Sequence, residues 1–386
     1  MKDEKRVSFS IRLVHEKGIP MAVLSPKPSI LEFGYSDLKL PSGRSTLLTQ
    51  ALQEQGFPIS SFKIDPYSRF KTLRLAAAVW RLPPAPIIFL RNPYFLNMVR
   101  CAVRLKYRLK ARLVVDALTS AYEVYVENYC QFKPGSRRAR QCQQEDELIG
   151  READLLIVDT KVHGEDLVSH FCCDPSKMLV VPVGTHFERR SQDQVTNSPP
   201  YGPEHSILFI GSFIPVHGVE VIVEAARQLQ ERSSNITFRL IGDGRQFNEI
   251  KQKTEGLSNV RFLGAMSIDE GILEMRKARL MIGVFGTSHQ TQLVVPFKVY
   301  AALAMGKPFI TARTAATETM LTHGVDSWLV PPGDPKALAD AIVHLVQSPE
   351  LLQKLGDGAR QSYRTKFDSR ITIQPLAERL MALGTT

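Results

Sequence analysis

Short apolar runs alternate with segments of helical spacing between Ser206 and Thr311, and this alternation limits the possible folds more than any other feature of the chain. Residues 219–229, for example, have apolar side chains at helical spacing between two such runs. Strands that alternate with helices form βαβ units and a parallel sheet. Ligands of such sheets bind beyond the carboxyl ends of the strands. The expected strands are 206–211, 236–242, 259–264, 280–286 and 307–311.

The first half of the chain shows the same alternation less regularly. Expected strands there are 20–25, 87–90, 112–116, 153–160 and 178–182, and expected helices are 42–56, 93–110 and 137–152. A polar, proline-rich stretch at 188–205 separates the halves and is typical of a linker. We therefore expect an α/β protein with two Rossmann-like domains, 1–187 and 206–368, whose parallel sheets face a cleft.

Charge and cysteine content restrict the partners and the compartment. The 386 residues have a formal charge of +10, which favours phosphorylated metabolites, a membrane surface or nucleic acid, although a generally basic solvated surface explains it equally well. Five cysteines without a CxxC pair fit a reducing compartment. The charged start, 1–6, argues against a secretory signal, and no apolar run approaches the roughly 18 residues of a spanning helix. We expect a cytoplasmic protein.

The segment 294–308 predicts an anion site. It has the order loop, short helix and glycine stop, and it lies between two expected strands. A helix N-terminus that follows a strand presents free backbone N–H groups to an anion. Lys298 stands in the first turn of this helix, where a cation is disfavoured unless an anion compensates it. The alternative is a solvated lysine, or one that is paired with a carboxylate.

Five segments of the second half, in order and over about 130 residues, resemble the retaining family-4 glycosyltransferases of the GT-B fold. They are 209–219, 240–244, 260–264, 301–308 and 326–334. The first half resembles this family more loosely, at 153–160 and 181–184. The resemblance implies a C-terminal domain that binds a nucleotide-diphosphate sugar and an N-terminal domain that binds the acceptor. It also implies a final helix, within 369–386, that packs back onto the N-terminal domain.

The chain departs from the family pattern at the donor site. The family commonly has an arginine and a lysine near its first C-domain glycine, and these positions are Ser212 and His217 here. Its two glutamates after the fourth strand of that domain correspond to Leu293 and Ala301. Either a divergent branch holds the diphosphate with Lys298 and His217, or the chain has lost catalysis and kept the fold.

The remaining candidate residues each have a functional and a structural interpretation. Lys298, His217 and Asp116 are the candidates for the chemistry, with Asp116 able to contact the acceptor or to cap or pair with the next helix instead. The resemblance places Phe262 near the nucleotide base, although it can equally be a core residue, and the glycines can serve turn geometry alone. The predicted donor-binding residues are Gly211, Ser212, Gly242, Gly244, Phe262, Gly264, Pro296 and Phe297.

A basic helix in the first half suggests a further partner. Residues 93–112 combine arginines and lysines with interleaved apolar and aromatic side chains. They can face anionic lipid headgroups or nucleic acid, or they can form an ordinary helix with a buried apolar face. No aromatic RNA-binding signature is present, so we expect no nucleic-acid partner. A membrane surface would suit a lipid-linked acceptor at the cytoplasmic face.

The leading hypothesis is a retaining, hexosyltransferase-like enzyme that moves a sugar from a nucleotide-diphosphate sugar to an acceptor saccharide, with a lipid-linked saccharide or a cell-surface polysaccharide precursor as candidates. Scattered histidines without an HxH or HxxxH pair predict no metal, and no other cofactor is expected. The alternatives are a catalytically inactive GT-B scaffold or partner subunit, and another sugar-nucleotide enzyme such as an epimerase.

Overall fold

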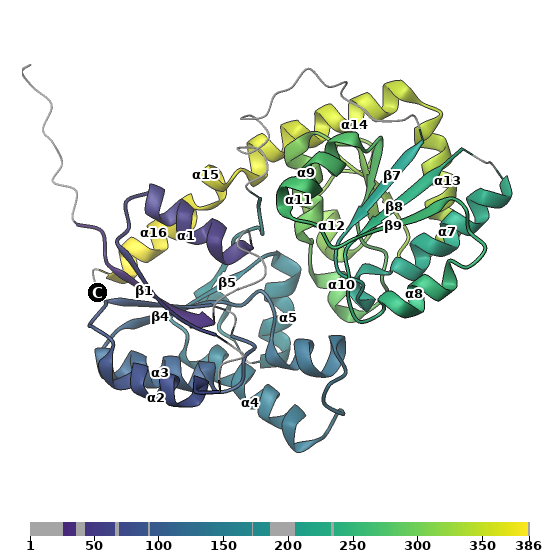
Figure 1. Cartoon of the computed structure of the whole chain (residues 1–386). Helices are drawn as coiled ribbons and strands as arrows, with labels where there is room; N and C mark the ends of the chain where they lie inside the picture. Colours follow the sequence, from purple (N-terminus) through teal and green to yellow (C-terminus); the bar gives the residue numbers. More distant parts are fainter. Residues whose placement is uncertain are drawn as a thin grey trace, which may run out of the picture.

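Two six-stranded parallel sheets, each with helices on both faces, form two domains that lie side by side (Figure 1). The computed structural model describes residues 26–35, 43–65, 69–91, 93–171, 173–185, 205–232 and 235–384. The expected strand at 20–25 and nearly all of the expected linker at 188–205 lie outside these residues. The expected α/β architecture with two Rossmann-like domains is confirmed.

The N-terminal sheet has the strand order β2-β1-β3-β4-β5-β6. Both faces are covered, so its central strands are continuous apolar runs, and the side chains of β5 are all fully buried. Its strands are β1 (Ile30–Tyr35), β2 (Ile59–Ile64), β3 (Ile87–Leu90), β4 (Arg112–Asp116), β5 (Leu155–Val158) and β6 (Met178–Val180). Its helices are α1 (Arg44–Glu54), α2 (Lys71–Arg81), α3 (Met98–Leu109), α4 (Arg137–Glu152) and α5 (Lys161–Phe171), with a π-helical turn η1 (Glu123–Asn128) and a 3₁₀ turn η2 (Pro175–Lys177).

The C-terminal sheet has the order β12-β11-β10-β7-β8-β9. Its strands are β7 (Ser206–Ile210), β8 (Thr237–Ile241), β9 (Val260–Gly264), β10 (Leu280–Ile282), β11 (Phe309–Ala312) and β12 (Trp328–Val330). Its helices are α7 (Val219–Arg232), α8 (Phe247–Lys253), α9 (Ile268–Lys277), α10 (His289–Leu293), α11 (Phe297–Met305), α12 (Ala315–Met320), α13 (Pro335–Val346) and α14 (Pro349–Ser362), with the turns η3 (Pro215–His217) and η4 (Tyr363–Phe367).

The chain returns to the N-terminal domain at its end. After α14 and η4, the short α15 (Ser369–Thr372) and α16 (Gln374–Gly384) run back beside α1 in Figure 1. Leu376 and Leu380 of α16 are buried in the same apolar cluster as Leu48 and Leu52 of α1. The last helix therefore closes one face of the N-terminal sheet and links the two domains a second time.

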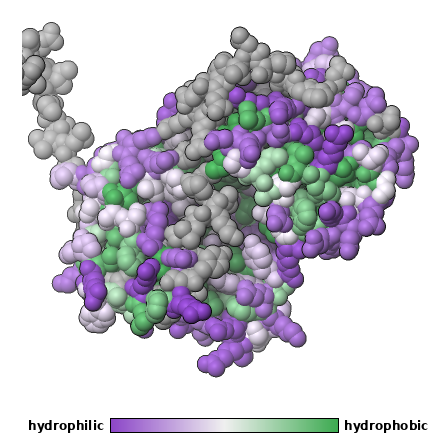
Figure 2. Space-filling model, viewed as in Figure 1, coloured by the Kyte–Doolittle hydropathy of each residue, from purple (hydrophilic) through white to green (hydrophobic). Residues whose placement is uncertain are grey.

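Several elements differ from the expected ones for physical reasons. β10 ends at Ile282, although the N–H of Gly283 still donates to the carbonyl of Ile310 at 2.7 Å. At Phe285 the chain has left β11, and the N–H of Phe285 donates to the carbonyl of His217 at 3.0 Å. The helix expected over 93–110 begins only at Met98. The sequence expectation omitted β1, β2, α2 and α5. On the face shown in Figure 2, hydrophilic residues are spread over both domains, which agrees with two separate apolar cores.

Candidate functional site

A pocket of about 600 Å³ lies between the two domains, at the carboxyl ends of strands from both sheets. From the C-terminal domain it receives the residues that end β7 and β8, the loop after β9 and the start of α11. From the N-terminal domain it receives Gly43, Arg44, Leu118, Thr119, Asp159 and Val183. Parallel α/β sheets bind ligands at this edge, so the pocket is the candidate site.

Lys298 is buried at this pocket without a carboxylate partner among the described residues. Its side chain is 6% exposed, and its Nζ lies 5.0 Å from the centre of the Phe209 ring. Burial lowers the pKa of Lys298 to about 7, because the ammonium loses its hydration. The expected alternatives, a solvated lysine or a lysine paired with a carboxylate, do not describe this environment.

His217 shares this corner of the pocket with Lys298. Its Nδ1 is hydrogen-bonded to the carbonyl oxygen of Ser212, so this nitrogen carries the proton. The His217 ring packs edge-on against Phe209 with a centroid distance of 6.0 Å. Burial lowers the pKa of His217 well below its ordinary value, and the Lys298 ammonium lowers it further. Two groups that can become cationic are therefore held together with no anion between them.

The predicted glycines have different roles. A Cβ at Gly211 would lie 2.7 Å from Cε of Lys298, so this glycine leaves room for the lysine side chain. A Cβ at Gly242 would lie 2.0 Å from the Gly211 carbonyl oxygen, and one at Gly244 would lie 2.6 Å from the Phe213 nitrogen. These two glycines allow neighbouring loops to pack closely. Gly264, with φ +73°, has open space around it and occupies a left-handed turn.

The pocket includes most but not all of the predicted donor-binding residues. Its lining includes Gly211, Ser212, His217, Gly242, Pro296, Phe297 and Lys298. Gly244, Phe262 and Gly264 are absent from the lining. Phe262 instead packs between Phe213 and Phe247, with centroid distances of 6.1 and 5.5 Å. The core interpretation of Phe262 therefore fits its position better than contact with a base.

The two positions that correspond to the family's glutamates are apolar and buried. Leu293 is 3% exposed and Ala301 is 1% exposed. Ala301 lines the pocket, one helical turn after Lys298. Among the described side-chain hydrogen bonds, Leu293 takes part in one. Its carbonyl oxygen accepts from Oγ1 of Thr160 at 2.5 Å. This wall of the pocket thus lacks the carboxylates that the resemblance would lead one to expect.

Asp116 belongs to a buried ion-pair network and does not line the pocket. Its Oδ1 lies 2.8 Å from Nε of Arg44, and its Oδ2 lies 3.2 Å from Nη1 of Arg91. Arg91 also pairs with Glu32 at 3.3 Å. With both oxygens bound to guanidinium groups, Asp116 orients Arg44. Its partners precede it in sequence, so the expected alternative of capping or pairing with the next helix was wrong. A direct role for Asp116 in the chemistry stays a prediction.

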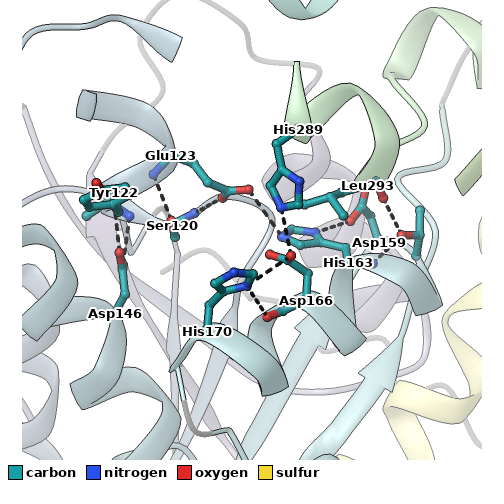
Figure 3. A network of polar contacts seen from close by, with 12 residues as sticks. Ser120, Tyr122, Glu123, Asp146, Asp159, His163, Asp166, His170, His289 and Leu293 are labelled. Atoms are coloured by element: carbon teal, nitrogen blue, oxygen red, sulfur yellow. Dashed lines mark hydrogen bonds and ion pairs between the residues drawn. The ribbon is translucent and has the colours of Figure 1, made fainter. Parts of the chain in front are cut away.

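A second polar network, which the sequence reasoning missed, lies on the N-terminal side of the pocket (Figure 3). Oδ1 of Asp159 lies 2.7 Å from Nδ1 of His163, and Nε2 of His163 lies 4.0 Å from Oε1 of Glu123. Asp159 and His163 are both fully buried. Their spacing of four residues, at the end of a strand and the start of a helix, is a signal in the sequence that could have revealed the pair.

Two contacts connect the domains beside this network. Nε2 of His289, in α10, lies 2.8 Å from Oδ1 of Asp166, in α5. Figure 3 shows Asp166 between His289 and His170, and Oδ1 of Asp166 lies 3.2 Å from Nδ1 of His170. The second contact is the hydrogen bond from Thr160 to the Leu293 carbonyl. Thr160 and Asp166 therefore place the N-terminal wall against the segment that leads to Lys298.

Residues 204–348 match the model of the family described as "Glycosyl transferases group 1". This match includes the strand ends, Gly211 and Lys298, which build one side of the pocket. Residues 204–348, less than half of the chain, are therefore similar to this glycosyltransferase family. The match to this family agrees with the resemblance seen in the sequence.

Curated relatives from three organisms are also glycosyltransferases. An uncharacterised glycosyltransferase of Methanocaldococcus jannaschii is 28% identical over 42% of this chain and 43% of its own length. The lipopolysaccharide core biosynthesis glycosyltransferase LpsD of Rhizobium meliloti is 29% identical over 42% and 46%. A D-inositol 3-phosphate glycosyltransferase of Corynebacterium glutamicum is 27% identical over 60% and 57%. The chain spans about half the length of these relatives.

Solved structures agree with the GT-B fold along most of the chain. Anabaena HepE, in a complex with UDP-glucose, superposes with a TM-score of 0.69 at 18% identity and covers 92% of this chain and 100% of its own. Sucrose-phosphate synthase of Thermosynechococcus elongatus superposes with a TM-score of 0.67 at 16% identity, covering 92% and 99%. At these identities the likeness concerns the fold alone.

The described residues contain neither a metal-binding cluster nor a membrane-spanning helix. Within the described residues, no group of three or more His, Cys, Asp or Glu side chains is arranged to hold a metal ion, and independence of metal stays a prediction. Over the same residues, none of the helices has both the length and the apolarity needed to cross a bilayer.

Proposed function

We propose that this GT-B protein transfers a sugar, with retention of configuration, from a nucleotide-diphosphate sugar to an acceptor saccharide. The observation that supports this most directly is Lys298, a buried lysine with no anionic partner among the described residues, at the start of α11 in the interdomain pocket. Burying an ammonium without an anion is unfavourable. A donor diphosphate supplies the missing negative charge, and the free N–H groups at the start of α11 add to its binding.

In this proposal the C-terminal domain binds the donor through Lys298, His217 and the loop at Gly211. Charge develops on the diphosphate as it leaves the anomeric carbon, and a fixed cation stabilises that charge in a water-poor site. Lys298 and His217 both gain a proton more readily beside a diphosphate, so both can donate to its oxygens in the transition state. These two groups replace the arginine and lysine that the family commonly has at the positions of Ser212 and His217, and the chain is then a divergent family-4-like branch.

Calorimetric titration with UDP, GDP and ADP, and with their glucose and mannose derivatives, tests the proposal. We expect one of these nucleotides to bind the wild-type protein and to bind Lys298→Met at least about tenfold more weakly. Nuclear magnetic resonance of the reaction product then gives the anomeric configuration. Absence of binding for every nucleotide would favour the second candidate, a catalytically inactive GT-B scaffold or partner subunit, which the apolar Leu293 and Ala301 motivate.

The acceptor in this proposal is a lipid-linked saccharide or a cell-surface polysaccharide precursor. LpsD acts in lipopolysaccharide core biosynthesis, and a second relative is an O-antigen chain mannosyltransferase of Escherichia coli, 22% identical over 54% of this chain. These names motivate the acceptor class for the present chain, and they leave the donor sugar and the linkage open. Such an acceptor would place the protein at a cytoplasmic membrane surface.

We extend the proposed membrane surface from residues 93–112 to include the neighbouring α2. The apolar residues of α3, such as Met98 and Leu105, face the core, and Lys106 pairs with Asp154 at 2.9 Å. Leu73 and Trp80 on the neighbouring α2 are 68% and 78% exposed, and Tyr107 of α3 is 64% exposed. Exposed arginines of the same two helices are Arg74, Arg81, Arg104 and Arg108, and Nη1 of Arg108 lies 3.4 Å from the Trp80 carbonyl oxygen. Exposed tryptophan and leucine among arginines suit an anionic bilayer surface.

A further inference from the structure

The N-terminal wall of the pocket contains two charged residues that each keep one buried polar atom without a partner. Arg44 is 5% exposed and Asp159 is fully buried, and both line the pocket. Nη2 of Arg44 and Oδ2 of Asp159 have no hydrogen-bond partner in the described part of the chain. A buried polar atom without a partner costs about 1–3 kcal/mol, so two of them in one pocket point to a ligand.

The other atoms of Arg44 are fully used, which fixes the direction of its guanidinium group. Nε binds Asp116 at 2.8 Å and Nη1 donates to the carbonyl of Val181 at 2.6 Å. Asp116 is itself held by Arg91. The network therefore presents Nη2 as a rigid donor at the start of α1, where Gly43 also lines the pocket.

His163 fixes Asp159 in a similar way. Burial opposes protonation of His163, but the hydrogen bond and charge of Asp159, together with Glu123 and Asp166, raise the pKa of His163 to about 9. An imidazolium therefore holds Oδ1 of Asp159 at neutral pH. Because His163 contacts Oδ1, the Oδ2 atom of Asp159 is left without a partner and can accept a hydrogen bond.

Arg44 and Asp159 both lie beside Val181, at the carboxyl ends of neighbouring strands. Nη1 of Arg44 donates to the Val181 carbonyl at 2.6 Å. The N–H of Val181 donates at 2.8 Å to the carbonyl of Val158, which directly precedes Asp159. The unpartnered donor and the unpartnered acceptor thus belong to one region of the N-terminal wall of the pocket.

We propose that Arg44 and Asp159 form a subsite for a neutral sugar or cyclitol ring of the acceptor, in which Nη2 of Arg44 donates to one ring oxygen and Oδ2 of Asp159 accepts from a ring hydroxyl. This subsite rests on the proposed transferase function. A hydroxyl group both donates and accepts, so neighbouring hydroxyls match this pair of atoms. A phosphate group at the same place would be repelled by Asp159. The hydroxyls can come from the acceptor or from the donor sugar, and the N-terminal position of both residues favours the acceptor.

Two variants with matched controls test this inference. Asp159→Asn removes the carboxylate charge, and its control is Asp146→Asn, another buried N-terminal aspartate that accepts from backbone N–H groups outside the pocket. Arg44→Lys keeps a cation for Asp116 but removes the guanidinium donor, and its control is Arg100→Lys, which keeps a cation for Glu145 outside this network. Thermal unfolding of all four variants identifies any that fail to fold.

The direct readout is the ring signal of His163 in a nuclear magnetic resonance titration with methyl α-glucopyranoside and with myo-inositol. We expect the probes to shift this signal in the wild-type protein and in both controls. We expect at least about tenfold weaker probe binding in Asp159→Asn and Arg44→Lys, because a site built for hydroxyls loses its match when one partner changes. A wild-type His163 signal that neither probe shifts, or equal losses in the controls, overturns the inference.

A second arm distinguishes the acceptor from the donor sugar. Calorimetry compares UDP with UDP-glucose, and GDP with GDP-mannose, in the wild-type protein and the variants. If the variants keep the wild-type ratio of sugar-nucleotide affinity to nucleotide affinity, the result supports an acceptor subsite. If this ratio falls to about one in Asp159→Asn, the carboxylate contacts the donor sugar, and the acceptor assignment is overturned. Failure of the wild-type protein to bind any nucleotide counts against the proposed function, and the titration with the two probes decides the subsite separately.

Discussion

The Nζ atom of Lys298 lies 5.0 Å from the centre of the Phe209 ring, and no carboxylate of the described chain pairs with it. An aromatic face attracts a cation by about 0.5–2 kcal/mol, which is less than the cost of removing an ammonium from water. The pKa of Lys298 is lowered to about 7 because the cost of desolvation exceeds the attraction to the Phe209 ring. Stability is thus lowered at the place where the pocket needs positive charge, as is common in binding sites.

Lys298→Met should stabilise the protein near neutral pH and weaken nucleotide binding. The unfolded chain keeps Lys298 protonated up to its ordinary pKa of 10.5, whereas the folded chain releases the proton near 7. The unfolded state therefore binds more protons between these values, and the free energy of unfolding attributable to this group rises with pH across the window. Below about pH 7 the variant should gain about 1–2 kcal/mol. Urea unfolding at about pH 6 and about pH 9 measures the difference between the wild-type protein and the variant.

Lys307 provides the control for this prediction. It is buried in the same domain, and burial lowers its pKa to about 8, but its Nζ donates to the carbonyl oxygens of Arg276 and Ala278 at 2.6 and 3.1 Å. Lys307→Met leaves these carbonyls without that donor and should lower stability, with nucleotide affinity kept in the fraction that folds. If Lys298→Met also destabilised the protein, the buried Lys298 ammonium would not be unfavourable for folding. The explanation of its low pKa by a missing anion would then be wrong.

Nucleotide binding should take up protons. At about pH 8 the free protein holds Lys298 mostly neutral, because its pKa is about 7, and a bound diphosphate raises that pKa again. His217, whose pKa burial and Lys298 keep low, shifts in the same direction. Calorimetry in buffers of different ionisation enthalpy should show uptake that approaches one proton, and affinity should fall as pH rises above about 7. Heats that do not depend on the buffer would contradict the assignment of Lys298 to the diphosphate.

Gly211→Ala should weaken nucleotide binding by displacing the Lys298 ammonium. The added Cβ would lie 2.7 Å from Cε and 2.8 Å from Nζ of Lys298, so the end of this flexible side chain must move. We expect an affinity loss of about tenfold, together with a loss of stability because the φ of +157° at Gly211 is unfavourable for alanine. Gly242→Ala is the contrast, because its Cβ would meet a backbone oxygen at 2.0 Å. That variant should be strongly destabilised, as thermal unfolding would show.

The sequence allowed the fold to be predicted further than the site. The alternation of strands and helices in 206–311 is local, and β7, β8, β9 and β11 lie where this pattern puts them. Lys298 could be located at a helix start from its neighbours alone. The burial of Lys298 could not be predicted in this way, because it depends on Phe209 and Gly211. Both residues are far from Lys298 in sequence and meet it only in the folded domain.

The N-terminal wall was the less predictable half of the pocket. Asp116 was chosen from the sequence because it ends a strand, but Arg44, 72 residues away, occupies its Oδ1. Asp159 also ends an apolar run, and it keeps a free oxygen atom because His163 binds only the other. Two aspartates in equivalent local positions thus differ in their tertiary partners, and no local pattern distinguishes them.

Replacement of Trp80 and Leu73 by alanine should weaken binding to anionic vesicles. Both side chains are more than two-thirds exposed on α2, and Arg74, Arg81, Arg104 and Arg108 are exposed on α2 and α3. Each arginine near an anionic surface contributes about 1 kcal/mol, which salt reduces, and the two apolar side chains insert at the headgroup level.

Flotation with phosphatidylserine vesicles should show salt-sensitive binding of the wild-type protein and at least about threefold less binding of the double variant. Leu273→Ala, at a residue 46% exposed on the C-terminal domain, should bind like the wild type. Equal binding of all three proteins, or binding that salt leaves unchanged, would place the membrane contact elsewhere.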